Sequence, residues 1–307
     1  MKISVDGGAL NPKNNQRFGT SVFSENLVAA LKLYDKKNQY FIYTFKNLRP
    51  KLFWLKGQVS IEEFINKKAV FLALNQAIPL YTSGKVISFC HGLSYYFHPQ
   101  FYPKRDVVRL KKQLEEMVKR SDKIIVSSEK VKKELISINQ SIDTKIVVLP
   151  FGIPFDMESE KIKNKNKYFL FVGMDHPIKN INFIKQAFNE FIKDKKYKDY
   201  KLYILTKNVS RKKLKKLYQK AAALLTSSHY ESFNFPVLEA LSQGCPVVGL
   251  KSAIIPELEI YMNLTNNVEE FVEKMKKITK KPSVQSINQL YTKFNWKNYV
   301  KNLVKLY

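Results

Sequence analysis

The sequence predicts an α/β protein of two domains, each built on a parallel β-sheet. Its 307 residues, 45% of them hydrophobic, are enough for two cores of about 150 residues each, the usual size of a domain. Short β-branched apolar runs alternate with segments of helical spacing, a pattern typical of parallel strands joined by helices. A polar run, Glu158–Lys167, has one apolar residue, Ile162, and predicts a linker. We therefore predict domains over residues 1–157 and 158–307.

The first half opens with a strand and a helix that follows a glycine. Met1–Asp6 predicts the first strand, and Gly19 lies before a helix through Asn26–Leu31. Such a beginning is general among α/β folds and does not by itself identify a function.

The second half restarts with a strand at Tyr168–Gly173. Pro177 then opens a helix whose apolar positions, Ile181, Ile184 and Phe188, have helical spacing. One strand, Leu202–Leu205, and one very basic helix, Arg211–Lys220, follow. Near the end, Phe294, Trp296, Val300 and Leu303 have the spacing of a packed helix, which we place at about residues 292–307.

The run from His229 to Gly249 is the most informative in the chain. Ala221–Leu225 before it and Pro246–Leu250 at its end are apolar and predict two buried strands. Pro236 suits the first turn of the helix between them, where its missing N–H costs nothing. Glu239 then falls in that first turn.

This strand-loop-helix-strand unit predicts a phosphate site. It places a helix N-terminus, with unpaired N–H groups and a partial positive charge, at the carboxyl edge of a parallel sheet. Glu231, just before the helix, could face a sugar beside a diphosphate, and Glu239 could accept hydrogen bonds from ribose hydroxyls. On spacing alone, the simpler interpretation is that both are solvated glutamates, because clustered carboxylates mark sites only statistically.

The same run resembles the E-x7-E signature of the family 4, or group 1, glycosyltransferases. Their pattern is approximately Y-E-G-F-G-x-P-x-x-E-A-x-x-x-G-x-P-V-V, and two of its glycines are Ser232 and Asn234 here, residue types that tolerate turns. The resemblance extends along most of the chain. It implies the GT-B fold, in which two Rossmann-like domains face each other across a cleft, the acceptor entering from the first and the donor lying mainly on the second. The final helix, about 292–307, would cross back to the first domain.

The resemblance implies a retaining enzyme that moves a hexosyl group from a nucleoside-diphosphate donor to a glycan or lipid-linked acceptor, with no metal or other cofactor. It also implies a role for individual residues. The implied assignments are Lys179, Phe233, Asn234 and Phe235 for the diphosphate, Glu239 for the ribose, Glu231 and His91 as catalytic residues at the transferred sugar, and Gly19 in the glycine loop.

Several positions depart from the family pattern. Gly92 replaces the aspartate that follows the family histidine, Phe151 stands where asparagine is usual, and Met174 stands where the family often has an arginine. Neutralisation of phosphate would then rest on Lys179 and the helix N-terminus, with Arg17 as a further candidate. The second domain also has one strand-helix unit where the family usually has about two. These departures leave open an inactive scaffold subunit.

The net charge is the other strong feature. With 53 Lys and Arg against 26 Asp and Glu, the formal charge is +27, which favours a polyanionic partner. The excess gathers in Lys104–Lys133 and Asn208–Lys220. An anionic membrane surface is one such partner, since each nearby lysine can add about 1 kcal/mol, and Tyr95-Tyr96-Phe97 and Phe101-Tyr102 are candidate apolar contacts. A general compositional bias toward lysine is the alternative.

A nucleic-acid-binding protein is the competing class, because the isoelectric point is near 9.8. Aromatic residues are interleaved with lysines at Tyr197–Tyr203, but no recognised nucleic-acid module is present. The two cysteines, Cys90 and Cys245, lie in strand-like runs in different halves, which favours a reducing compartment. The sequence shows no metal-ligand spacing, signal peptide or apolar stretch near 18 residues. We expect a cytoplasmic protein, peripheral at the inner face of the membrane.

Overall fold

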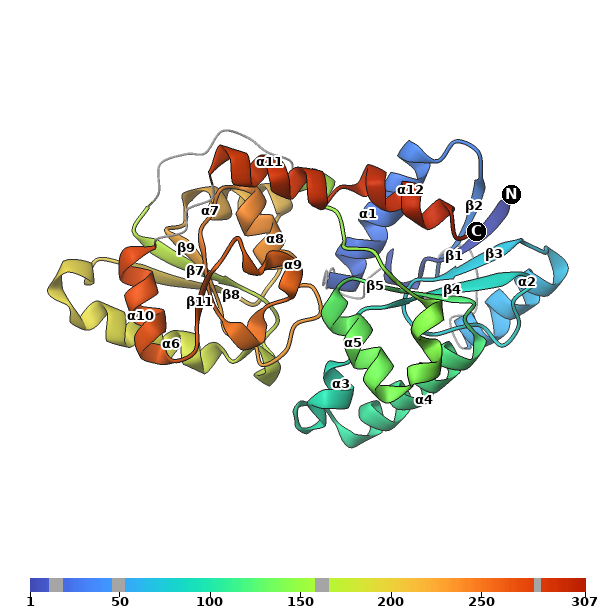
Figure 1. Ribbon diagram of the computed structural model, residues 1–307, viewed down its shortest axis with the longest axis horizontal. Helices are drawn as coiled ribbons and strands as arrows, with labels where there is room; N and C mark the ends of the chain where they lie inside the picture. The colour runs from blue at the N-terminus through green and yellow to red at the C-terminus, as the bar shows by residue number, and fades with distance from the viewer. Residues whose placement is uncertain (11–18, 46–52, 158–165, 279–282) are drawn as a thin grey trace. The chain divides into compact units, whose positions relative to one another are not determined.

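The computed structural model describes residues 1–10, 19–45, 53–157, 166–278 and 283–307, which form two compact units (Figure 1). Unit 1 contains residues 1–151 and 296–307, and unit 2 contains residues 152–295. The chain thus leaves unit 1 at residue 151, whereas the sequence-based boundary is at 157. Most of the predicted linker, residues 158–165, and the candidate cation Arg17 lie outside the described residues. The assignment of acceptor and donor to the two halves stays a prediction.

Unit 1 is built on one six-stranded sheet in which all neighbouring strands are parallel. Its order is β2-β1-β3-β4-β5-β6, so the chain reverses direction across the sheet between β1 and β3. Its strands are β1 (Lys2–Asp6), β2 (Gln39–Tyr43), β3 (Val70–Ala73), β4 (Lys85–Cys90), β5 (Lys123–Val126) and β6 (Ile146–Val148).

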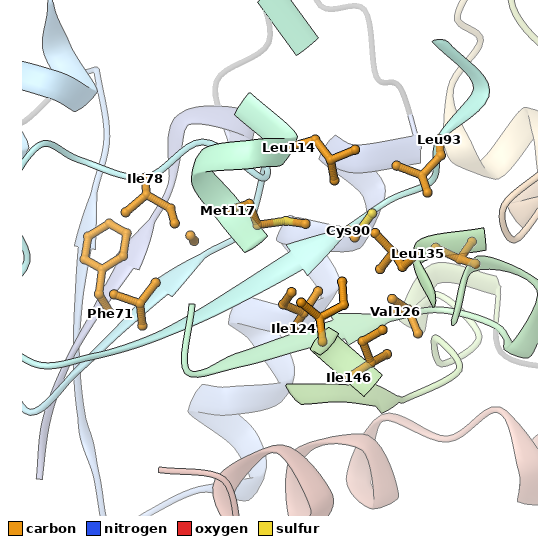
Figure 2. Packing of buried hydrophobic residues seen from close by; sticks show 14 of the residues in the cluster. Phe71, Ile78, Cys90, Leu93, Leu114, Met117, Ile124, Val126, Leu135 and Ile146 are labelled. Atoms are coloured by element: carbon orange, nitrogen blue, oxygen red, sulfur yellow. The ribbon is translucent and has the colours of Figure 1, made fainter. Parts of the chain in front are cut away.

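The helices of unit 1 pack on both faces of this sheet. They are α1 (Gly19–Tyr34), α2 (Ser60–Ile65), α3 (Ser94–Phe97), α4 (Lys104–Arg120), α5 (Glu129–Ile138) and α12 (Trp296–Val304). Successive side chains of β4 point to opposite faces of the sheet and so identify the two faces. Cys90 lies in the core with Leu114 and Met117 of α4 and Leu135 of α5 (Figure 2). The preceding residue, Phe89, faces Phe23 of α1, with ring centroids 5.5 Å apart.

Helix α12 is the C-terminal element of unit 1. Its Trp296 and Tyr299 lie beside the ring of Phe23 in α1, at centroid distances of 6.0 and 6.2 Å. The chain end is held at the far side of α1, where the hydroxyls of Tyr40 and Tyr307 are 3.3 Å apart. These contacts fasten the last twelve residues, 296–307, to the first helix of the chain.

Unit 2 is a second parallel sheet, of five strands in the order β11-β10-β9-β7-β8. The strands are β7 (Tyr168–Val172), β8 (Lys201–Leu205), β9 (Ala223–Thr226), β10 (Val247–Leu250) and β11 (Asn263–Thr265). The helices are α6 (Ile181–Lys193), α7 (Arg211–Lys220), α8 (Phe235–Ser242), α9 (Pro256–Glu259), α10 (Val268–Lys277) and α11 (Val284–Lys293). The reversal of strand order falls between β7 and β9.

The aromatic residues that alternate with lysines near residue 200 belong to the core of unit 2. Tyr197 and Tyr200 pack on Phe191, with centroids 4.5 and 5.3 Å away, and Tyr200 also stacks on Phe169 at 5.5 Å. Their rings are thus used in packing α6 against β7. Two of the three aromatic residues in Tyr197–Tyr203 are therefore used in packing, whereas Tyr203 is 39% exposed, which weakens the case for a nucleic-acid-binding surface.

Candidate functional site

Lys179 and Glu231 lie in the loops that follow β7 and β9, the neighbouring strands between which the strand order reverses. Open α/β sheets bind ligands outside the carboxyl ends of their strands at such a point. The sequence predicted a helix opening at Pro177. Instead, Pro177–Lys179 form a separate 3-10 turn, and α6 begins at Ile181 because Asn180 is left-handed, with φ 50°.

The carboxylate of Glu231 is buried and paired. Its Oε1 accepts hydrogen bonds from Nζ of Lys179 and from Oγ of Ser228, each at 2.6 Å. Glu231 is 8% exposed, and the Lys179 side chain is 18% exposed. Solvent therefore screens this ion pair much less than a surface pair. The interpretation of Glu231 as a solvated glutamate is wrong.

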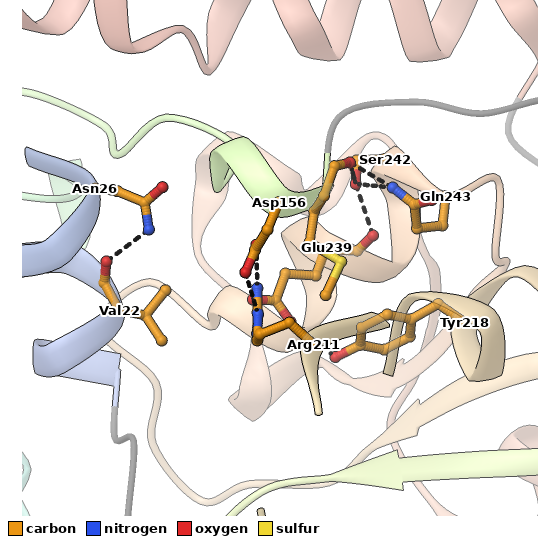
Figure 3. Close-up of polar contacts among 9 residues, drawn as sticks. Val22, Asn26, Asp156, Arg211, Tyr218, Glu239, Ser242 and Gln243 are labelled. Carbon is orange, nitrogen blue, oxygen red and sulfur yellow. Dashed lines mark hydrogen bonds and ion pairs between the residues drawn. The ribbon is translucent and has the colours of Figure 1, made fainter. Parts of the chain in front are cut away.

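Glu239 is buried as well, in the second turn of α8. The sequence placed it in the first turn, but the helix begins at Phe235. Its Oε1 accepts from Nη2 of Arg211 at 2.7 Å, and its Oε2 accepts from the hydroxyl of Tyr218 at 3.0 Å (Figure 3). Burial raises the pKa of Glu239, and the charge of Arg211 acts in the opposite direction. With 2% of its surface exposed, Glu239 is not a solvated side chain either.

Arg211 is a residue of this region that the sequence analysis missed. Its Nε and Nη2 donate to Oδ2 and Oδ1 of Asp156 at 2.7 and 2.8 Å, and Nη2 also donates to Glu239 (Figure 3). We treated it only as part of a basic helix. Arg211 is the first residue of α7, where the helix dipole disfavours a cation. That position is the sequence signal that could have indicated a carboxylate nearby.

The loop before α8 is shaped by Asn234, whose φ of 67° and ψ of 68° are left-handed. The family has glycine here, and asparagine is among the few other residues that adopt this conformation readily. Phe233 and Phe235 on either side are buried, with ring centroids 5.4 Å apart. Because both rings pack inside unit 2, a ligand at this loop would meet its backbone.

His91 and Gly19 belong to unit 1. Nε2 of His91 lies 2.6 Å from the carbonyl oxygen of Leu74. A carbonyl can only accept, so Nε2 carries the proton and Nδ1 is an acceptor. Burial lowers the pKa of His91 to about 4, so the ring is neutral at pH 7 and is no general acid there. Gly19 is the exposed first residue of α1.

A family sequence model covers the part of unit 2 from β8 to α11. Residues 203–294 match the model of "Glycosyl transferases group 1", and this range contains both Glu231 and Glu239. Residues 203–294 are a group 1 glycosyltransferase domain.

Curated relatives of this glycosyltransferase are distant. Over 273 residues it is 26% identical to the O-antigen chain mannosyltransferase RfbU of Salmonella typhimurium, which covers 81% of the chain and 72% of RfbU. Over 225 residues it is 26% identical to a probable sucrose-phosphate synthase of Thermosipho melanesiensis, which covers 60% of the chain and 53% of that protein. The chain thus spans about half the length of the latter relative.

Solved structures share the fold along the whole chain. Sucrose-phosphate synthase from Thermosynechococcus elongatus superposes with a TM-score of 0.72 at 12% identity, covering 100% of this chain and 98% of that one. HepE from Anabaena, solved in complex with UDP and glucose, gives 0.70 at 12% identity, with 99% and 98% covered. The glycosyltransferase therefore has the GT-B fold, as predicted from the sequence.

The glycine that replaces the family aspartate next to His91 is required by the backbone of this glycosyltransferase. Gly92 has φ 121°, a conformation nearly closed to other residues. We expect Gly92→Ala and Gly92→Asp each to lower the free energy of unfolding by about 1–3 kcal/mol, measured by urea denaturation. Gly57→Ala is the matched control, since a Cβ there would meet only Cβ of Phe53, at 3.5 Å. Equal stability of the Gly92 and Gly57 variants would contradict this.

Proposed function

We propose that this glycosyltransferase binds the nucleoside diphosphate of its donor on unit 2 and transfers the sugar, with retention of configuration, to a glycan or lipid-linked acceptor. The observation that carries the proposal is the buried Lys179–Glu231 pair, at 2.6 Å, in the loops after β7 and β9. A lysine and a carboxylate at the strand-order reversal of an α/β sheet suit a phosphorylated sugar.

In this proposal Lys179 and the backbone at Phe233–Phe235 bind the diphosphate, and Glu239 accepts hydrogen bonds from the ribose. Glu231 and, through Nδ1, His91 contact the transferred sugar. Catalysis comes from orientation of the donor and stabilisation of the departing diphosphate. Since His91 is neutral at pH 7, it accepts or orients and does not donate a proton to the leaving group.

Two relatives support a hexosyl donor carrying uridine. HepE was solved with UDP and glucose, and RfbU is described as a mannosyltransferase. We take UDP as the first nucleotide to test, and glucose or mannose as the first sugars.

A thermal-shift comparison of UDP, GDP, ADP and CMP tests the donor site. A nucleotide at a hundred times its dissociation constant adds about 2.7 kcal/mol to stability, a shift of several degrees in Tm for a domain of this size. We expect one diphosphate to stand out. No shift with any nucleotide, together with salt-sensitive binding to RNA or DNA, would instead support the inactive-scaffold or nucleic-acid-binding alternative.

For a lipid-linked acceptor, we propose that the enzyme lies in the cytoplasm and is peripheral at the inner, anionic face of a membrane. One predicted apolar contact needs correction: Tyr95 is 5% exposed and lies in the core of unit 1, whereas Phe97 is 40% exposed. A more exposed apolar cluster lies on unit 1 at Ile61, Phe64, Ile65, Leu80 and Tyr81. No helix in the described part of the chain is both long and apolar enough to span a bilayer.

This cluster has a cation beside it. The rings of Phe64 and Tyr81 are 5.6 Å apart, and Nη1 of Arg120, at the end of the basic helix α4, donates to the carbonyl of Pro79 at 2.5 Å. Apolar side chains next to basic ones suit an anionic bilayer surface.

Flotation with liposomes tests this contact. We expect the wild type to float with vesicles that contain anionic phospholipid and not with neutral vesicles. The double variant Phe64→Ser, Leu80→Ser should lose most of this binding. Ile260→Ser in unit 2 removes a residue of similar exposure, 66%, and serves as control. Equal flotation with neutral vesicles would remove the electrostatic argument, and unchanged binding of the double variant would exclude this cluster.

A further inference from the structure

The buried carboxyl group of Glu239 accepts hydrogen bonds on both oxygens only when it is ionised, and a nearby cation favours the ionised form. Glu239 is 2% exposed, and burial favours the protonated form of a carboxyl group. A protonated carboxyl would donate one hydrogen bond and lose part of its accepting capacity. Two vicinal hydroxyls of a ribose need acceptors, so the proposed role of Glu239 depends on its staying ionised.

Helix α7 supplies one donor to each oxygen of this carboxylate. Arg211 and Tyr218 are two turns apart and therefore lie on the same face of α7. Arg211 donates to Oε1 at 2.7 Å, and Tyr218 donates to Oε2 at 3.0 Å. An ionised carboxylate has about four acceptor positions. Each oxygen thus keeps capacity for a second donor, such as a ligand hydroxyl.

The guanidinium is itself held in place. Nε and Nη2 of Arg211 donate to the two oxygens of Asp156, at 2.7 and 2.8 Å (Figure 3). This two-pronged geometry fixes the plane of the guanidinium and is not available to a lysine. The Arg211 side chain is 19% exposed, so both of its ion pairs are only partly screened by solvent.

Helix α7 carries five more cations: Lys212, Lys213, Lys216 and Lys220, which are exposed, and Lys215, which is half-buried. Strands β9 and β10 carry no charged or titratable side chain, and the adjacent Cys245 has a buried thiol. Helix α11, which packs on α8, contributes Tyr291 and Lys293, whose polar atoms donate to the carbonyls of Met157 and Glu257. Burial has the largest effect on the pKa of Glu239 and raises it, and Arg211 is the main group that acts in the opposite direction. The hydrogen bond from Tyr218 adds to the effect of Arg211, and the charge of Asp156 adds to that of burial.

We propose that Arg211 is a positioning residue of the donor site, which keeps Glu239 ionised and oriented so that its carboxylate accepts the ribose hydroxyls. This rests on the proposed function of Glu239. The proposal assigns Arg211 no contact with the substrate. It predicts that loss of Arg211 makes recognition of the ribose dependent on pH, an effect that a merely structural role would not produce.

The test compares the affinities of UDP and 2′-deoxy-UDP by calorimetry between pH 5.5 and 8.5. We expect the wild type to prefer UDP about tenfold over this whole range, the loss expected for one hydrogen bond to a charged group. In Arg211→Gln the preference should weaken toward the acidic end of this range, where more of Glu239 is protonated, and return toward the alkaline end. Arg211→Lys should keep part of the preference, because lysine keeps the positive charge but cannot make the two parallel hydrogen bonds to Asp156.

Asp156→Asn distinguishes the effect of the charge of Arg211 from the effect of its fixed orientation. It removes the partner of Arg211 but leaves the cation, so we expect a weaker preference for UDP that does not vary with pH. Arg109→Gln, in an exposed ion pair of unit 1, is the control and should match the wild type. Melting temperatures show which variants are folded.

The outcomes distinguish the positioning role from the donor site itself. If Glu239→Gln loses the preference for UDP at every pH while Arg211→Gln keeps it at every pH, the ribose site stands and the positioning role is overturned. The same pH dependence in Asp156→Asn as in Arg211→Gln would also overturn it. If Glu239→Gln itself keeps the full preference, the ribose role of Glu239 fails, and the inference fails with it.

Discussion

Lys179→Ala should reduce binding of the donor nucleoside diphosphate at least tenfold and turnover about 100-fold or more. Lys179 is the cation in contact with Glu231 at the strand-order reversal of unit 2. The arginine that the family often supplies here is Met174 in this chain. Removal of Lys179 also leaves Glu231 with an uncompensated charge in a buried site, where it would repel phosphate.

Calorimetry with UDP and a donor-consumption assay measure the two effects. Lys185→Ala is the matched control, because Lys185 lies on the exposed face of the next helix, α6. Lys185→Ala should keep the melting temperature of the ligand-free wild type, whereas Lys179→Ala should melt at a lower temperature, because Glu231 loses its cation, and should still be folded at the assay temperature. Near-normal binding and turnover in Lys179→Ala would contradict the assignment of this loop as the diphosphate site.

Glu231→Gln should have a different effect: turnover falls about 100-fold, while UDP binds as tightly as in the wild type or more tightly. The amide preserves the shape of the side chain but removes the negative charge that now holds Nζ of Lys179 at 2.6 Å. The lysine is then available to the diphosphate without competition from a carboxylate. The transferred sugar, in contrast, loses a charged contact.

Single-turnover kinetics and UDP calorimetry on the same preparation separate these effects. Ser228→Ala removes the other donor to Glu231, at 2.6 Å, without changing the charge, and should reduce turnover far less. A parallel loss of UDP affinity and turnover in Glu231→Gln would mean that Glu231 binds the nucleotide or supports the loop, and does not act at the sugar.

The elements of this enzyme could be predicted from local sequence, because each depends on its own residues. The strands at β9 and β10 follow from short apolar runs, and Pro236 marks the beginning of α8. The errors lie at boundaries. Asn180 and Asn234 are left-handed and lie directly before the first residues of α6 and α8. The sequence analysis did not predict these two breaks, and it therefore misplaced the turn of Lys179 and the position of Glu239 in α8.

The pairing of charges could not be read from the sequence, because it depends on residues far apart in the chain. Lys179 and Glu231 are 52 positions apart, and Asp156 and Arg211 are 55 apart. Only the fold brings these residues into contact, which is why two buried glutamates looked equally compatible with a solvated surface. Tyr95 shows the reverse case: an aromatic run that suggested a membrane contact supplies a core residue of unit 1.

Release of nucleoside diphosphate from a set of UDP-, GDP- and ADP-hexoses, compared between the wild type and Lys179→Ala, is the most direct test of the donor site. We predict that the wild type consumes one class of donor, faster when a glycan or lipid-linked acceptor is present, and that Lys179→Ala does not. Consumption of no donor by folded wild-type protein, or equal consumption by both proteins, would contradict the proposed site.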